Sequence, residues 1–229
     1  MKVAVLFSGG KDSTYAVKHC LDQGWNITLI SVKPTSDEAY IWHFPTVELT
    51  PLQAEALGIK KHIYLECNEI GPETEAKVID PVLKKLDVEA IILGGVGLQE
   101  TQIKEVTKIA NKYGIKVIVP HSYLNSEELL KEELDKGLEI MITECAAGGL
   151  TKEWLGATIS KENFNEFKAL SKKHGFDLLG EGGAYNTFII DAPFFKNRVE
   201  IINSEKHWDE KTRSGYLVAK AAIKNKLTV

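Results

Sequence analysis

The residues best suited to chemistry lie near the start of the chain, where residues 8–13 read Ser-Gly-Gly-Lys-Asp-Ser. An apolar run at 2–7 precedes them and apolar residues at helical spacing follow at 12–23, which predicts a turn between a strand and a helix. Gly9 and Gly10 let the backbone approach a ligand without obstruction by a Cβ atom. The N-terminus of the following helix offers N–H groups and a partial positive charge, so the sequence predicts a phosphate-binding turn.

The polar side chains of this turn indicate how phosphates are held. Ser8 and Ser13 add hydroxyl donors, and Lys11 adds a positive charge. Asp12 would repel phosphates unless a cation lay between them, so its presence predicts Mg²⁺ bridging the carboxylate and the phosphate oxygens. A plain strand-to-helix turn is the alternative, but such a turn does not need Lys, Asp and two serines around its glycines.

Two better-known phosphate loops do not match this turn. A Walker A loop has a glycine five residues before its second glycine, where this chain has Val5, and it has Ser or Thr after the lysine, where this chain has Asp12. A dinucleotide fingerprint needs three glycines, and the turn has only Gly9 and Gly10. The turn is therefore of another kind.

Strand and helix signals alternate through the first 120 residues. Expected strands lie at 2–7, 26–32, 63–67, 90–93 and 116–119, and expected helices at 12–23, 50–57, 72–86 and 103–113. Thr50 and Gln53 fit a capping box around Pro51, and Pro81 must bend or split its helix. This alternation predicts an α/β fold with a Rossmann-like parallel five-stranded sheet flanked by helices, and ligands at the carboxyl ends of the strands.

The pattern changes after residue 121. Helices are expected at 129–136 and, capped by Ser160, at 160–175, with strands at 138–146, 187–191, 199–202 and 216–219. These elements predict a smaller C-terminal α+β domain. The expected division is a phosphate-binding domain at 1–121 and the smaller domain at 122–229, without a flexible linker between them.

Composition narrows the class of protein. The net charge is −4 with no lysine-rich block, so non-specific nucleic-acid binding is not expected. No run of about 18 apolar residues occurs, and residues 1–7 are too short for a signal segment, so we expect a cytoplasmic protein without a membrane span. Cys20, Cys67 and Cys145 have no CxxC or metal-ligand spacing and are expected to be reduced core residues.

The stretch Ser8–Ser13 resembles the PP-loop of N-type ATP pyrophosphatases at every position. The resemblance implies that the loop holds the β- and γ-phosphates of ATP, that the α-phosphorus is attacked and that pyrophosphate leaves. It implies catalytic roles for Lys11, Asp12 and Ser13. Further ATP contacts are expected from Ser31 and Val32 at the end of the second strand, and from Gly94 and Gly95 at the end of the fourth strand. For the two glycines, a plain loop is the alternative.

Three further stretches, 48–59, 149–156 and 180–195, are similar to the diphthine–ammonia ligase family and its archaeal relatives. The resemblance covers nearly the whole chain. It implies that the carboxylate of diphthine, a modified histidine on elongation factor 2, is adenylylated and then amidated by ammonium. The cysteines lack the setting of a glutaminase nucleophile, so free ammonium is the expected nitrogen source. ATP, ammonium and elongation factor 2 are the expected partners, and a homo-oligomer is left open.

The stretch 180–191 carries the residues expected to contact the substrate, although a plain turn is the alternative for its glycines. They are Glu181, Gly182, Gly183, Tyr185, Asn186 and Asp191. The chain has Ala184 and Asn186 where the family usually has acids, which removes two carboxylates from this segment. A long loop at 35–46, with Trp42 and His43, is interpreted either as a lid or as a segment anchored to the core.

Three functions fit these features. The first is an ATP-dependent ligase that forms an amide. The second is a PP-loop tRNA-modifying enzyme, against which the acidic charge and the missing cysteine pair count. The third is a non-catalytic ATP-binding sensor, against which the intact loop with Asp12 counts.

Overall fold

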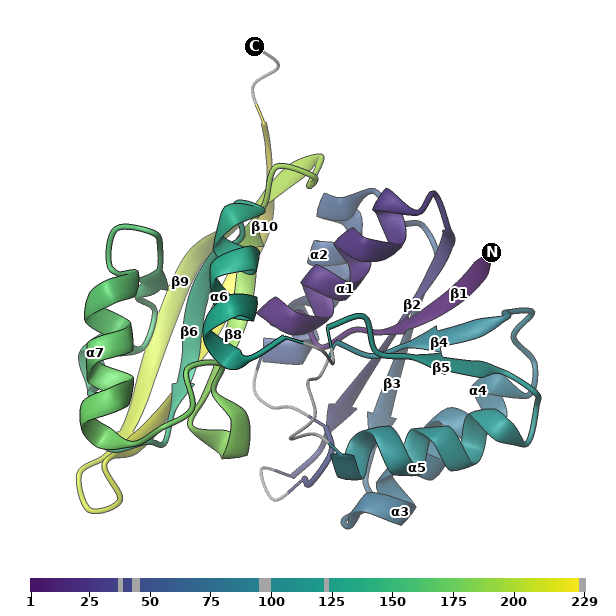
Figure 1. Cartoon of the computed structure of the whole chain (residues 1–229), viewed down its shortest axis with the longest axis horizontal. Coiled ribbons are helices and arrows are strands. Elements are labelled where there is room, and N and C mark those ends of the chain that lie inside the picture. Colours follow the sequence, from purple (N-terminus) through teal and green to yellow (C-terminus); the bar gives the residue numbers. More distant parts are fainter. Residues whose placement is uncertain (37–38, 43–45, 95–99, 122–123, 227–229) are drawn as a thin grey trace.

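The computed structural model describes residues 1–36, 39–42, 46–94, 100–121 and 124–226 (Figure 1). Its strands are β1 (Lys2–Leu6), β2 (Asn26–Pro34), β3 (His62–Cys67), β4 (Ala90–Ile92), β5 (Lys116–Ile118), β6 (Glu139–Cys145), β7 (Thr158–Ile159), β8 (Tyr185–Asp191), β9 (Asn197–Asp209) and β10 (Ser214–Asn225). Its α-helices are α1 (Lys11–Asp22), α2 (Thr50–Leu57), α3 (Pro72–Ala76), α4 (Asp80–Leu83), α5 (Glu100–Asn111), α6 (Ser126–Asp135) and α7 (Phe164–His174). Short 3₁₀ turns lie at Thr46–Leu49, Lys77–Ile79, Lys152–Trp154 and Glu181–Gly183.

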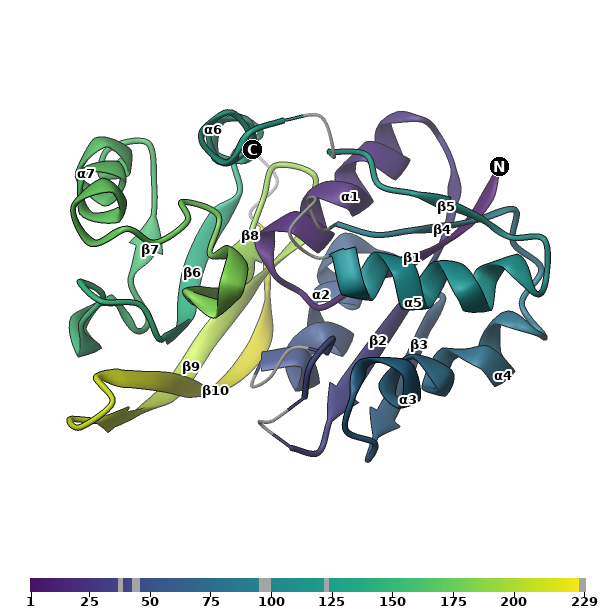
Figure 2. The ribbon, with the colours of Figure 1, turned by 60° about the horizontal axis from the view of Figure 1, so that its bottom comes forward.

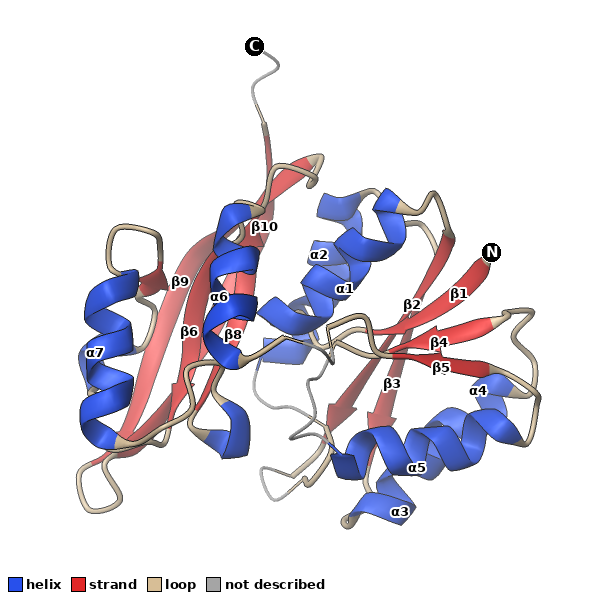
Figure 3. Ribbon diagram, viewed as in Figure 1, coloured by secondary structure: helices blue, strands red, loops and turns tan. Residues whose placement is uncertain are grey.

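The first sheet has the order β3-β2-β1-β4-β5, and all its pairings are parallel. Successive residues of β1 point to opposite faces, and both faces are covered, so Val3, Ala4 and Val5 are all fully buried. The predicted parallel five-stranded sheet is therefore confirmed. All five strands run in the same direction, so the loop after β1 and the ends of β2 and β4 lie at one edge of the sheet (Figure 3).

Helices cover both faces of this sheet. Val3 and Val5 pack in one core with residues of α1 and α2, while Ala4 and Leu6 pack in a second core with residues of α3, α4 and α5. This division follows the alternation of side chains along a strand. The first core continues into the second half of the chain.

The second sheet is antiparallel. β6 pairs with β8 along one edge and with β7 and β10 along the other, and β10 pairs with β9. α2 packs against β9 and β10, and α1 against β8 and α6, so the layer of α1 and α2 lies between the two sheets (Figure 1). Because apolar residues from both halves form one core, the halves hold each other in place. The smaller α+β second half is confirmed, while the boundary at residue 121 stays a prediction.

Four local predictions can be compared directly with the structure. The capping box at Thr50 is wrong: Thr50 donates to Val47 O, and Gln53 turns away to bond buried carbonyls. Ser160 does not cap α7, because the helix begins at Phe164, after Asn163, and has no side-chain cap. The Asn163 side chain instead accepts from Ser160 N and donates to Thr158 O in the preceding turn. The helix containing Pro81 is split, as predicted, and the last two strands have 13 and 12 residues, where four each were expected. Within the described ranges, no helix combines the length and apolarity needed to cross a bilayer.

Candidate active site

The turn after β1 has the geometry of a loop that binds phosphate. Gly9 has a φ of +82°, a conformation that glycine adopts without strain. Gly10 precedes α1 and, as a glycine, has no side chain that could cap the helix N-terminus. Ser13 Oγ donates to Gly10 O at 3.1 Å and lies 3.2 Å from Ser8 Oγ, so both hydroxyls face the same turn. The loop residues predicted from the sequence therefore converge at the N-terminus of α1.

A strand from the second half of the chain fixes this loop from the side. The backbone N–H of Lys11 donates to Thr187 Oγ1 at 3.1 Å, and the N–H of Ile189 donates to Gly9 O at 3.0 Å. The buried Gln53 amide donates to Gly9 O at 2.8 Å and to Ile189 O at 2.7 Å, and so links α2, the loop and β8. The position of the loop therefore depends on both halves. Sequence reasoning missed Gln53 and Thr187 as supports of the site.

The charged centre of the loop is buried. Lys11 is 1% exposed, and its Nζ lies 2.7 Å from Asp12 Oδ2. Burial alone would lower the pKa of Lys11, but the charges of Asp12 and Glu133 outweigh it and leave the pKa above its usual value. Glu133, from α6, is fully buried, and this burial raises its pKa well above the usual range. Lys11 therefore stays charged between two acids, of which the sequence indicated only Asp12.

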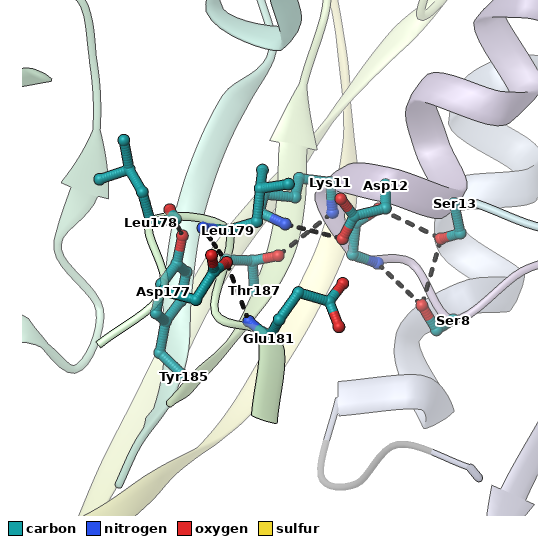
Figure 4. Close-up of polar contacts among 11 residues, drawn as sticks. Ser8, Lys11, Asp12, Ser13, Asp177, Leu178, Leu179, Glu181, Tyr185 and Thr187 are labelled. Carbon is teal, nitrogen blue, oxygen red and sulfur yellow. Dashed lines mark hydrogen bonds and ion pairs between the residues drawn. The ribbon is translucent and has the colours of Figure 1, made fainter. Parts of the chain in front are cut away.

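Glu181 faces this centre from the segment that precedes β8. Figure 4 shows its carboxylate directed toward the loop. Asp177 holds the segment: its Oδ1 accepts from Leu179 N at 2.8 Å and from Glu181 N at 3.4 Å, and its Oδ2 accepts from Ser126 Oγ at 2.6 Å. Burial, assisted by the charge of Asp12, raises the pKa of Glu181 to about 7. Glu181 can therefore exchange a proton near neutral pH.

A cavity of about 1020 Å³ joins the loop to the second sheet. This volume is at the upper end of the range for small-molecule sites. The predicted residues that line it are Ser8, Gly10, Lys11, Asp12, Glu181, Gly182, Gly183, Tyr185 and Asn186. A second cavity of about 50 Å³ lies beside the loop and shares Ser8 and Asp12 with it, and Ser13, Val32 and Gly94 complete its predicted lining. The loop and the substrate segment thus face a common space.

Other predicted residues lie elsewhere. Ser31 is fully buried within the first sheet, where its hydroxyl donates to Phe7 O at 2.6 Å, and it lines neither cavity. Asp191 lies at the far end of β8 and pairs with Lys226 at 2.6 Å and with Arg198 at 3.5 Å. Both have structural partners that sequence reasoning could not foresee. Gly95 lies outside the described residues.

The described part of the long loop at 35–46 is anchored to the first half. The carboxylate of the buried Glu75 accepts from Tyr40 N and Ile41 N, both at 2.8 Å, and Trp42 Nε1 donates to Glu75 O at 3.1 Å. Gln102 Nε2 donates to Ile41 O at 2.7 Å. These contacts favour the interpretation of Trp42 as a core anchor that also lines the cavities, while His43 lies outside the described residues.

Gly94 packs directly against the phosphate loop. A Cβ atom at this position would lie 2.5 Å from the backbone of Asp12 and Ser13, so the loop would have to shift. We expect Gly94→Ala to weaken ATP binding at least tenfold and to lower the free energy of unfolding by about 1–3 kcal/mol, which is typical of overpacking. Nucleotide titration and urea unfolding measure both effects. Gly148→Ala is the matched control, because its Cβ would meet nothing within 4 Å, and equal behaviour of the two variants would contradict this packing.

Comparison with known proteins agrees with this geometry. Residues 1–117 match the diphthamide synthase N-terminal domain family, and residues 125–224 match the diphthamide synthase C-terminal domain family. The diphthine–ammonia ligase of Homo sapiens is 32% identical over 90% of this chain and 84% of its own length. This chain belongs to the diphthine–ammonia ligase family. The Schizosaccharomyces pombe diphthine–ammonia ligase is 27% identical over 99% of this chain and 40% of its own length.

The family assignment makes this chain an ATP-dependent ligase with a PP-loop. All three cysteines are free and buried, as predicted, and none is among the described residues that line the two cavities. Burial raises the pKa of Cys20 and Cys145 to about 12. A thiol of that kind is a poor nucleophile. The segment 149–156, which carried part of the resemblance, lies outside both cavities and supports the second half, where Trp154 packs on Phe167 at 5.1 Å.

Proposed function

We propose that this member of the diphthine–ammonia ligase family adenylylates the carboxylate of diphthine on elongation factor 2 and then amidates it with ammonium. The observation that carries the proposal is the shared cavity. Its lining includes Lys11 and Asp12 of the PP-loop together with Glu181 and Asn186 of the second half. A nucleotide held by the loop and a carboxylate held by the second half would therefore meet in one cavity. A ligation of two substrates needs them to be positioned together in this way.

The loop is built to hold the leaving pyrophosphate. Lys11 supplies a buried positive charge, and the N-terminus of α1 and the hydroxyls of Ser8 and Ser13 supply donors. In the first step, an oxygen of the acceptor carboxylate attacks the α-phosphorus of ATP, an acyl-adenylate forms and pyrophosphate leaves. Charge on the leaving group is then stabilised by donors that are already in place.

Asp12 is the proposed residue for Mg²⁺. Its Oδ2 pairs with Lys11, but its buried Oδ1 has no hydrogen-bond partner among the described residues. No cluster of three or more metal-ligating side chains occurs in the described part of the chain. Mg²⁺ is commonly held by one or two carboxylates together with substrate phosphates and water, so a single aspartate beside a phosphate loop fits this ion. Bound there, Mg²⁺ would neutralise phosphate charge.

Glu181 is proposed to prepare the nucleophile. With a pKa near 7, its carboxylate can take a proton from ammonium and leave ammonia beside the loop. Ammonia then attacks the acyl carbon, the bond to AMP breaks, and an amide and AMP are the products. The nitrogen loses one further proton in this step, which solvent accepts.

The test is incubation with ATP, Mg²⁺ and ammonium, with elongation factor 2 that carries diphthine as acceptor. AMP and ADP are separated by chromatography, and the acceptor mass is measured. We expect AMP and pyrophosphate in equal amounts, together with the amidated factor. Factor without diphthine is the control and should give no AMP above background. ADP as the product, or AMP formed at the same rate with and without diphthine on the factor, would contradict the proposal.

A further inference from the structure

The two serine hydroxyls of the phosphate loop are engaged within the loop. Ser13 Oγ donates its one proton to Gly10 O at 3.1 Å. The 3.2 Å contact between Ser13 Oγ and Ser8 Oγ therefore takes its proton from Ser8, because a serine hydroxyl has a single proton. Both protons are used in this arrangement, and each bond must open before that serine can donate to a phosphate.

A third hydroxyl beside the loop, that of Thr187, is arranged differently. Its Oγ1 accepts from Lys11 N at 3.1 Å, a bond that uses a lone pair of the oxygen and leaves its proton over (Figure 4). No acceptor for this proton is found among the residues that the structure describes. Thr187 is half-buried and lines the large cavity, so its hydroxyl proton is available to a ligand there.

The position of β8 holds this hydroxyl at the start of α1. β8 pairs with β6, and α1 packs against β8, so the strand lies beside the first turn of the helix (Figure 2). A Cβ atom on Gly10 would lie 3.1 Å from Thr187 O and 3.3 Å from Thr187 Oγ1. Gly10 therefore lets the strand approach the loop, and the bond from Ile189 N to Gly9 O at 3.0 Å fixes the register.

The bond between Lys11 and Thr187 also favours an anion at the free proton. The N–H of Lys11 is the first of α1, where the helix carries a partial positive charge and where anions commonly bind. Thr187 accepts from this N–H and can direct its own proton into the cavity. Successive hydrogen bonds polarise one another, so such a hydroxyl is a stronger donor than an isolated one.

We propose that Thr187 is a phosphate-binding residue whose hydroxyl donates to an oxygen of the phosphates held at the N-terminus of α1. The proposal rests on the function proposed above and makes its ATP site composite, with one donor from the second half of the chain. Lys11 is the one lysine or arginine among the described residues that line the cavity. An anion as highly charged as pyrophosphate is therefore best stabilised beside Lys11, where Thr187 lies.

The test is calorimetric titration of the purified full chain with pyrophosphate in the presence of Mg²⁺. Thr187→Val keeps the branched shape without the hydroxyl, and Thr187→Ser keeps the hydroxyl. We expect Thr187→Val to bind pyrophosphate at least about tenfold more weakly, the effect of losing a hydrogen bond to a charged group, and Thr187→Ser to stay within about threefold. Thr158→Val, at an exposed position on β7, is the matched control and should stay within about twofold.

A further variant separates ligand binding from support of the loop. Gln53 is fully buried, donates to Gly9 O and Ile189 O, and lines neither cavity. Gln53→Leu leaves these carbonyls without that donor, so the ligand-free chain should melt at least about 5 °C lower. Thr187→Val should melt within about 2 °C of the unchanged chain, because water in the cavity can accept from Lys11 N in place of the hydroxyl.

The proposal is overturned if Thr187→Val loses less than about tenfold in pyrophosphate affinity, or if Thr187→Ser binds as weakly as Thr187→Val. A larger fall in the melting temperature of Thr187→Val, comparable with that of Gln53→Leu, would make the hydroxyl a support of the loop only. Absence of pyrophosphate binding by the unchanged chain would also overturn the proposal. Because the titration contains neither acceptor nor ammonium, its failure would leave amidation intact, and failure of amidation would leave its result intact.

Discussion

Replacing Lys11 with methionine is expected to lower the rate of AMP formation by about 10²–10³-fold, the usual cost of losing one donor that stabilises charge in a transition state. Lys11 is the buried cation at the head of the PP-loop, and its Nζ is held by Asp12 at 2.7 Å. Without it, the carboxylate of Asp12 faces the phosphates with no compensating charge from the protein. Steady-state AMP production at saturating ATP measures the effect.

The control for this variant is Lys172→Met, which removes an exposed lysine from the end of α7. It should keep the rate within about twofold, since surface substitutions of this kind change little. Methionine has nearly the length of lysine, so circular dichroism should show that the Lys11 variant still folds. A rate within tenfold of the unchanged chain would remove the role assigned to Lys11.

Replacing Glu181 with glutamine is expected to lower the ammonium-dependent rate by about 10²–10⁴-fold near pH 8, the range of general base catalysis. The pH dependence gives a sharper expectation. Glu181 has a pKa raised to about 7, so below that pH it is protonated and cannot accept a proton. At fixed total ammonium, the rate of the unchanged chain should rise with pH and level off above about pH 7.

The unchanged chain should thus show a break in its pH–rate profile near pH 7, and the Glu181→Gln variant should lack this break. Its residual rate depends on free ammonia alone, so it should keep rising with pH through the region where the unchanged chain levels off. Glu166→Gln, at an exposed position on α7, is the matched control and should keep the break. A break near pH 7 that survives in Glu181→Gln would assign the titrating group to another residue.

Much of the first half could be predicted from sequence because its signals are local. Each strand of the parallel sheet is buried on both faces, so it reads as a short apolar run, and each helix carries an apolar stripe. The turn at Gly9 and Gly10 follows from the same local pattern. The strands of the second half were harder to place, because β9 and β10 are largely exposed. Ile202 on β9 is 67% exposed, and its polar neighbours are typical of a loop as much as of a strand.

The supports of the site could not be predicted, because they are contacts between distant residues. Gln53 and Ile189 are 136 positions apart, and Lys11 and Thr187 are 176 apart. The sequence predicts Gln53 to be part of a helix cap. In the structure its amide donates to two buried carbonyl groups instead, because buried carbonyl groups require hydrogen-bond partners. In the sequence, Glu133 is one of several acids on α6 and nothing distinguishes it from a surface residue. In the structure it is fully buried and close enough to Lys11 to affect its pKa.

Asp191 shows the opposite case. It lies in the same segment as Glu181 and was predicted to contact the substrate. β8 is an extended strand of seven residues, so its two ends are far apart, and Asp191 meets Arg198 and Lys226 at the end away from the loop. Proximity in sequence placed Glu181 and Asp191 together, and the extended strand separates them.

The central claim is that the acceptor carboxylate attacks the α-phosphorus of ATP within the cavity. Diphthine-bearing elongation factor 2 labelled with oxygen-18 in that carboxylate tests it most directly. Attack followed by amidation transfers one carboxylate oxygen to AMP, so mass spectrometry should find one oxygen-18 atom in each AMP molecule and none in pyrophosphate. AMP without the label, or label in inorganic phosphate, would contradict adenylylation of the carboxylate.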